Sequence, residues 1–121
     1  MAQVETQSGI SDPVVGSALR ELGRKLSERF GRKYVKIMLF GSRARGDNHA
    51  ESDADVAVVL RGRITNRWSL KRLIIQDTYL ILLETGLYIQ AWPLEEGELD
   101  DPDESSNPTL LRSVVRDGIT L

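Results

Sequence analysis

Apolar residues recur every three or four positions in three stretches of the chain, at residues 13–30, 66–86 and 107–118. This spacing predicts three amphipathic helices. Each stretch opens with residues that favour a helix N-terminus and closes on glycine: Asp12-Pro13 and Gly31, Asn66 and Gly86, Asn107-Pro108 and Gly118.

Shorter segments rich in branched and aromatic residues lie between these helices and predict strands at 34–40, 54–60 and 87–92, the last ended by Pro93. Ile119 to Leu121 is a candidate edge strand. The order of elements predicts an α/β (α+β) fold, a small mixed β-sheet with helices packed on one face. The long helix between the second and third strands predicts a right-handed crossover.

The remaining segments are polar. Residues 41–53 predict a loop with one short helical turn after Gly41-Ser42, and residues 95–106 an acidic loop, because seven of the ten residues 95–104 are acidic. Residues 1–10 are expected to be flexible. A chain of 121 residues fits one domain, 1–121.

Composition excludes several classes of protein. The chain has no cysteine, which rules out disulfide scaffolds, thiolate zinc sites and cysteine nucleophiles. A net charge of −2, from 16 basic and 18 acidic side chains, argues against direct nucleic-acid binding. The sequence shows no secretory signal and no apolar run of the roughly 20 residues that cross a bilayer, so a cytoplasmic protein is expected.

The candidate chemistry lies between the first two strands, in Gly41-Ser42-Arg43-Ala44-Arg45-Gly46 and Ser52-Asp53-Ala54-Asp55. Glycine allows a sharp turn and a close approach by a ligand, and the N–H groups that follow it suit phosphate oxygens. Asp53 and Asp55 project from one strand face about 6–7 Å apart. Two such like charges predict a bound divalent cation, and magnesium between phosphates fits best.

A purely structural role for the two aspartates is the alternative to metal binding. Asp53 could be a turn residue and Asp55 an exposed strand position, but the apolar run after Asp55 argues for a buried strand, where an unpaired carboxylate is costly. An EF-hand loop is disfavoured here, because the sequence after Asp53 has no glycine and no glutamate at the positions that such a loop requires. A Walker site is excluded because Asp47 and Asn48 stand where Lys-Ser/Thr is required.

The spacing of these two motifs before an apolar strand resembles the nucleotidyltransferase superfamily typified by DNA polymerase β, and at this length the minimal nucleotidyltransferase (MNT) domain. The resemblance implies a polymerase β-like fold, ATP or another NTP as substrate, and two Mg²⁺ ions. It implies catalytic, metal-binding roles for Asp53 and Asp55, and nucleotide-binding roles for Gly41, Ser42, Arg43, Arg45 and Ser52. The two arginines serve a structural salt bridge equally well.

The chain departs from the family on the strand after the long helix, where full transferases carry a third carboxylate. Gln90 stands at that position, and an amide offers a metal an oxygen but cannot act as a base. Base assistance is worth about 10²- to 10⁴-fold in rate, so its loss slows turnover without abolishing it. Asp77 and Glu84 are candidate substitutes, although a solvated or capping role is favoured for both. Trp68 and Trp92 are expected to be packing residues.

The leading hypothesis is a Mg²⁺-dependent nucleotidyltransferase that moves a nucleoside monophosphate, AMP from ATP, onto a hydroxyl of a partner protein. MNT proteins of this size resemble antitoxins of toxin–antitoxin pairs, which implies a HEPN-type toxin as the partner. A catalytically weakened module that neutralises the partner by contact is the alternative. Modification of a small alcohol is disfavoured because no second domain is evident. Homo- or hetero-oligomerisation stays open.

Overall fold

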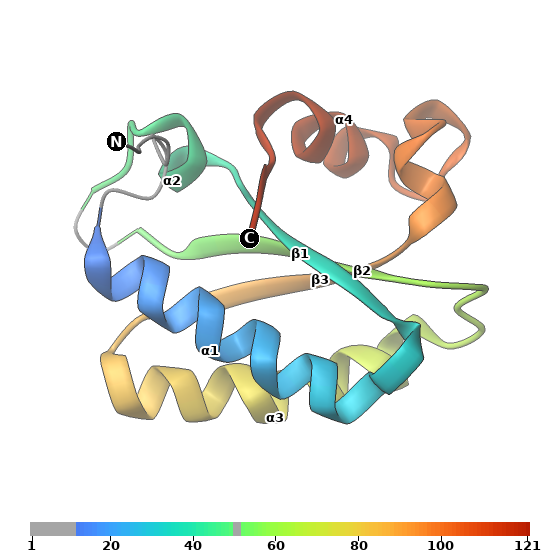
Figure 1. The fold of residues 1–121 in the computed structure, drawn as a ribbon. Helices are drawn as coiled ribbons and strands as arrows, with labels where there is room; N and C mark the ends of the chain where they lie inside the picture. Colours follow the sequence, from blue (N-terminus) through green and yellow to red (C-terminus); the bar gives the residue numbers. More distant parts are fainter. Residues whose placement is uncertain (1–11, 50–51) are drawn as a thin grey trace, which may run out of the picture.

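The computed structural model describes residues 12–49 and 52–121, and the expected flexibility of residues 1–10 concerns a segment outside them. The strands are β1 (Tyr34–Phe40), β2 (Ala54–Leu60), β3 (Ile89–Glu95) and β4 (Ile119–Thr120). They form one four-stranded sheet in the order β3-β2-β1-β4 (Figure 1). β1 is antiparallel to β2 and β4, whereas β2 and β3 are parallel. The predicted mixed sheet and fold class are confirmed.

Helices cover both faces of this sheet, so the expectation of helices on one face is wrong in that respect. α1 (Pro13–Phe30) and α3 (Arg67–Thr85) pack on one face, and α4 (Pro108–Asp117) packs on the other (Figure 1). The cause lies in β2, which is apolar on both sides and fully buried from Val56 to Val59. A strand that is apolar on both sides needs cover on both sides.

The residues predicted to cap the helices do so. The backbone N–H of Val14 donates to Asp12 at 2.9 Å, that of Ser69 to Asn66 at 3.0 Å, and that of Leu110 to Asn107 at 3.3 Å. Side-chain caps of this kind satisfy backbone groups that the first helical turn leaves unpaired. The short turn predicted after Gly41 is α2 (Ser42–Arg45).

β3 continues through Pro93 to Glu95, so the predicted end of the strand at Pro93 is wrong. Among the described residues, β3 lies at the edge of the sheet and pairs with β2 alone. Proline is tolerated on an edge strand because its missing N–H can face away from the partner. The acidic segment that follows contains two 3₁₀ turns, Glu96–Leu99 and Pro102–Glu104.

Two single-residue expectations also fail. Asp77 is 6% exposed and accepts two hydrogen bonds from Arg29, at 2.8 and 3.1 Å, which joins α3 to α1. Trp68 is 69% exposed and therefore does not pack in the core. No helix in the described ranges is long and apolar enough to cross a membrane.

Candidate active site

The start of β2 brings Gly41, Asp55 and Gln90 together. Asp55 pairs with Phe40 of β1 on one side and with Gln90 of β3 on the other. Its neighbours in β2, Ala54 and Val56, point into the core beneath α1 and α3, so Asp55 points to the α4 face.

Gln90 lies on this same face. Its neighbours Ile89 and Ala91 belong to the α1 and α3 core, and neighbouring residues in a strand point to opposite sides. Adjacent strands are about 4.8 Å apart, so residues 90 and 55 are direct neighbours in the sheet. Gln90 also lines a small pocket with Lys71 and Thr78 of α3 at this edge. That Gln90 takes the place of the third carboxylate stays a prediction.

The Asp55 carboxylate lies so close to residue 41 that only glycine fits there. Its φ of 78° lies in the region that favours glycine, and a Cβ atom there would stand 2.6 Å from Oδ2 of Asp55. No other residue fits without moving that carboxylate. The Asp55 carboxylate thus lies directly against the glycine turn.

Asp53 and Asp55 repel each other. Asp53 is exposed just before β2, whereas Asp55 is half-buried. Burial raises the pKa of Asp55, the charge of Asp53 raises it further, and the charge of Arg45 opposes the rise. A cation shared by the two carboxylates would relieve this repulsion, and carboxylate and amide oxygens are ligands that Mg²⁺ accepts. The donor set of Asp53, Asp55 and Gln90 therefore fits this metal.

Arg43 and Ser52 hold the loop that leads to Asp53. Arg43 is 7% exposed and donates from Nε to the Ser52 carbonyl at 2.9 Å. The Ser52 hydroxyl accepts from the His49 backbone N–H at 2.8 Å. Both residues were predicted to bind nucleotide, and the contacts seen here are internal to the loop.

Arg45 links the glycine turn to α4. Its guanidinium pairs with Asp47 at 3.1 Å and with Asp117 at 3.0 Å. These carboxylates raise the pKa of Arg45, and Arg116 and Arg45 lower the pKa of Asp117. Arg45 is therefore close enough to act on Asp55 through its charge, while its hydrogen bonds go to two other aspartates.

A third carboxylate is absent from the described part of this site. Residues 12–49 and 52–121 contain no group of three or more His, Cys, Asp or Glu that could hold a metal ion. Asp77 is bound to Arg29 in the core on the opposite side of the sheet, and Glu84 is exposed on α3. Neither substitutes for the missing acid.

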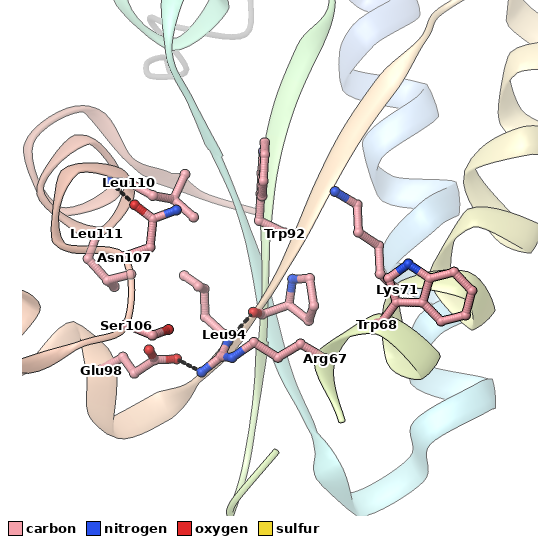
Figure 2. Close-up of a pocket in the computed structure, with 11 residues that line it drawn as sticks. Arg67, Trp68, Lys71, Trp92, Leu94, Glu98, Ser106, Asn107, Leu110 and Leu111 are labelled. Carbon is pink, nitrogen blue, oxygen red and sulfur yellow. Dashed lines mark hydrogen bonds and ion pairs between the residues drawn. The ribbon is translucent and has the colours of Figure 1, made fainter. Parts of the chain in front are cut away.

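A pocket of about 430 Å³ on the α4 face was not predicted. It lies between β3, the start of α3 and the start of α4, and Trp92 stands in it with Lys71 4.1 Å from its ring centre (Figure 2). The Trp92 Nε1 atom is buried and has no hydrogen-bond partner among the described residues. A buried unpaired donor costs about 1–3 kcal/mol. The sequence does hold a sign of this pocket, because the alternation of side chains along β3 puts Gln90, Trp92 and Leu94 on one face of the sheet.

The model of the nucleotidyltransferase domain family matches residues 19–106. The match covers most of the chain, and the chain belongs to this family. The predicted recognition is thereby confirmed at the level of the domain. Nucleotidyltransferases of this family generally use a nucleoside triphosphate and a divalent metal.

Three solved structures share the fold. A putative nucleotidyltransferase from Sulfolobus solfataricus is 22% identical over 93% of this chain and 88% of its own, with a TM-score of 0.50. A toxin–antitoxin solved with AMP-PNP is 24% identical over 82% of this chain and 68% of its own, with a TM-score of 0.53. A mutant of the toxin–antitoxin MntA-HpeT is 22% identical over 80% of this chain and 67% of its own, with a TM-score of 0.52. The curated proteins gave no match.

Proposed function

We propose that this protein transfers AMP from ATP to a hydroxyl group of a partner protein in a Mg²⁺-dependent reaction. The observation that carries the proposal is the contact between the Asp55 carboxylate and the Gly41 turn, with Gln90 beside it. In a nucleotidyltransferase domain this arrangement joins a turn suited to phosphates with a carboxylate suited to a cation.

The glycine turn is assigned to the triphosphate. Gly41 leaves room for a phosphate to approach the backbone, and Ser42 offers a hydroxyl and an N–H at the first position of α2, where N–H groups lack helical acceptors. Arg43 holds the loop before Asp53 by its bond to Ser52 and so positions that carboxylate. Arg45 adds positive charge near the site.

In the proposed step the acceptor hydroxyl oxygen attacks the α-phosphorus while the bond to the oxygen bridging the α- and β-phosphates breaks. Pyrophosphate leaves with that electron pair, and the acceptor proton passes to water. Mg²⁺ held by Asp53, Asp55 and the Gln90 amide oxygen would stabilise the phosphate charges and lower the pKa of the acceptor hydroxyl.

Gln90 sets the expected rate. The Gln90 amide can orient and coordinate a metal ion, but it cannot take a proton. The reaction therefore runs without the roughly 10²- to 10⁴-fold rate increase that a general base supplies. Phosphoryl transfer depends mainly on positioning and charge stabilisation, which Gly41, Asp53 and Asp55 retain. A slow enzyme is therefore expected.

We propose a HEPN-type toxin as the acceptor protein and an antitoxin role for this chain. Two structures that share the fold are toxin–antitoxins, one of them with AMP-PNP, and the resemblance to MNT domains points to the same partner class. The alternative is neutralisation by contact alone. The missing third carboxylate favours that alternative, because it removes the acid that full transferases use.

One experiment separates the two functions. The protein is incubated with Mg²⁺, ATP labelled at the α-phosphate, and the product of the adjacent gene if that product is a helical protein with an Arg-x4–6-His motif. We expect label on the partner, loss of label with Asp53→Asn, and full labelling with Asp103→Asn, an exposed aspartate paired with Arg112. A stoichiometric complex that inhibits the partner without any label would overturn the transferase.

A further inference from the structure

The pocket around Trp92 lies one step along the sheet from the proposed metal site. Gln90 stands beside Asp55, and Trp92 follows two residues later on the same face of β3. Two residues of a strand span about 6–7 Å, and neighbouring strands lie about 4.8 Å apart. The Cβ atoms of Asp55 and Trp92 are therefore separated by roughly 8 Å, a gap that a ribose can bridge.

We propose that this pocket binds the adenine base of the nucleotide whose phosphates lie at Gly41. The inference rests on the proposed function, which places the α-phosphate at Asp53 and Asp55. A volume of about 430 Å³ falls within the range of small-ligand sites. Trp92, Leu94, Leu110 and Leu111 supply an aromatic ring and apolar walls, and bases bind to proteins largely through such surfaces.

Two polar groups on the pocket wall suit the edge of adenine. Asn107 uses Oδ1 to accept the Leu110 N–H, which leaves its amide nitrogen as a donor on the Trp92 side in Figure 2. Glu98 accepts bonds from Arg67 and from the Glu95 N–H through Oε1, so Oε2 is left as an acceptor. Adenine presents an amino donor next to a ring-nitrogen acceptor, which matches this pair.

Phosphate is a poor occupant of the same pocket. Arg67 is held by the Glu98 carboxylate at 2.7 Å and by the Pro93 carbonyl at 2.7 Å, which neutralises its charge (Figure 2). Lys71 lies over the Trp92 ring rather than at the centre of an anion site. An apolar side chain of the partner protein is the other occupant, and the experiment below tests it.

Binding of ATP and of inorganic tripolyphosphate to the full chain, each with Mg²⁺, isolates the contribution of the base. Calorimetric titration is expected to show ATP binding at least tenfold more tightly than tripolyphosphate. Asn107→Asp keeps the oxygen that caps α4 but replaces the amide donor. It should weaken ATP about tenfold and leave tripolyphosphate unchanged. Asn66→Asp makes the same change at the cap of α3, outside the pocket, and should alter neither.

Tryptophan emission gives a second readout, because the chain contains only Trp68 and Trp92. In Trp68→Phe the remaining fluorescence comes from Trp92, and ATP should quench it whereas tripolyphosphate should not. Equal affinity for the two ligands, with no effect of Asn107→Asp, overturns the base pocket. That result would leave the pocket to an apolar segment of the partner.

The two proposals fail in different ways. If ATP binds through the base as described but no label reaches the partner, the base pocket stands and the transferase falls. If label is transferred but Asn107→Asp leaves the KM for ATP unchanged, the transferase stands and the base pocket falls.

Discussion

Asp77 and Asp55 both lie where water is partly excluded, but on opposite faces of the sheet. Asp77 is 6% exposed beneath α1, and Arg29 binds both of its oxygens. Asp55 is half-buried on the α4 face, its carboxylate accepts no hydrogen bond within the described residues, and its pKa is raised by burial and by Asp53. The Asp77 charge is neutralised inside the fold by Arg29, whereas the Asp55 carboxylate has no ion-pair partner among the described residues.

This difference follows from how each face is covered. α1 and α3 are long helices that seal their face with an apolar core. α4 has ten residues and covers only part of the other face, above Phe40, Ala57 and Leu94. Asp55 and Gln90 are only partly buried, and the Trp92 pocket lies where the start of α4 meets β3 and the start of α3. The shorter helix therefore leaves Asp55 and Gln90 only partly covered.

Gln90→Glu offers the largest expected effect, because it adds the missing acid to the open face. We expect transfer to the partner to rise about 10²- to 10⁴-fold, since a carboxylate beside Asp55 can take the acceptor proton and hold the metal. The initial rate of label transfer at saturating Mg²⁺ measures this. Gln76→Glu, an exposed change on α3, is the control and should leave the rate unchanged. An unchanged rate in Gln90→Glu would mean that residue 90 takes no part in the step.

Asp77→Asn tests the ion pair on the sheet face that α1 and α3 cover. Removing this carboxylate leaves the Arg29 guanidinium, whose side chain is 28% exposed, without its charge partner. We expect a loss of about 2–3 kcal/mol in the free energy of unfolding, less than for a fully buried pair because Arg29 reaches some water.

Urea unfolding measures this loss, and Asp103→Asn is the matched control. Asp103 pairs with Arg112 at the surface, where both side chains are more than half exposed. An exposed pair contributes about 1 kcal/mol or less, so this variant should unfold almost like the natural chain. Equal losses in the two variants would contradict a structural role for the Asp77 pair. Labelling by folded Asp77→Asn protein should stay normal.

Much of this fold follows from local sequence. β1 and β2 have the predicted bounds because both segments are mostly apolar and are followed by loop-forming residues, Gly41 and Arg61-Gly62. The helices begin at their predicted caps because the capping interactions are made within a few residues.

The failures concern contacts between distant segments. The Arg29–Asp77 pair joins residues that are 48 positions apart, and no local sequence pattern predicts it. Strand continuation through Pro93 depends on β3 being the edge strand, which is a property of the whole sheet. The Trp92 pocket needs β3, α3 and α4 together, and no local pattern shows this. The large area of an aromatic ring predicted packing for both tryptophans, which holds for Trp92 but not for Trp68.

The smallest expected effect is the pH dependence that Asp55 gives to stability without metal. Its pKa is higher in the folded chain than in the unfolded one, so the folded state holds the proton more tightly. The stability due to this group is complete below the unfolded pKa of about 3.9 and is lost as the pH rises through the folded pKa. Asp55→Asn removes this loss.

The melting temperature of Asp55→Asn relative to the natural chain should therefore increase from pH 3 to pH 7 in the absence of Mg²⁺. The corresponding gain in the free energy of unfolding should stay within about 1 kcal/mol, because solvent screens a half-exposed carboxylate. Added Mg²⁺ and ATP should reverse the order at pH 7, since only the natural chain keeps both carboxylates for the ion. A difference that is constant with pH would show that the Asp55 charge is as well accommodated as that of Asp77, and the contrast between the two faces would fail.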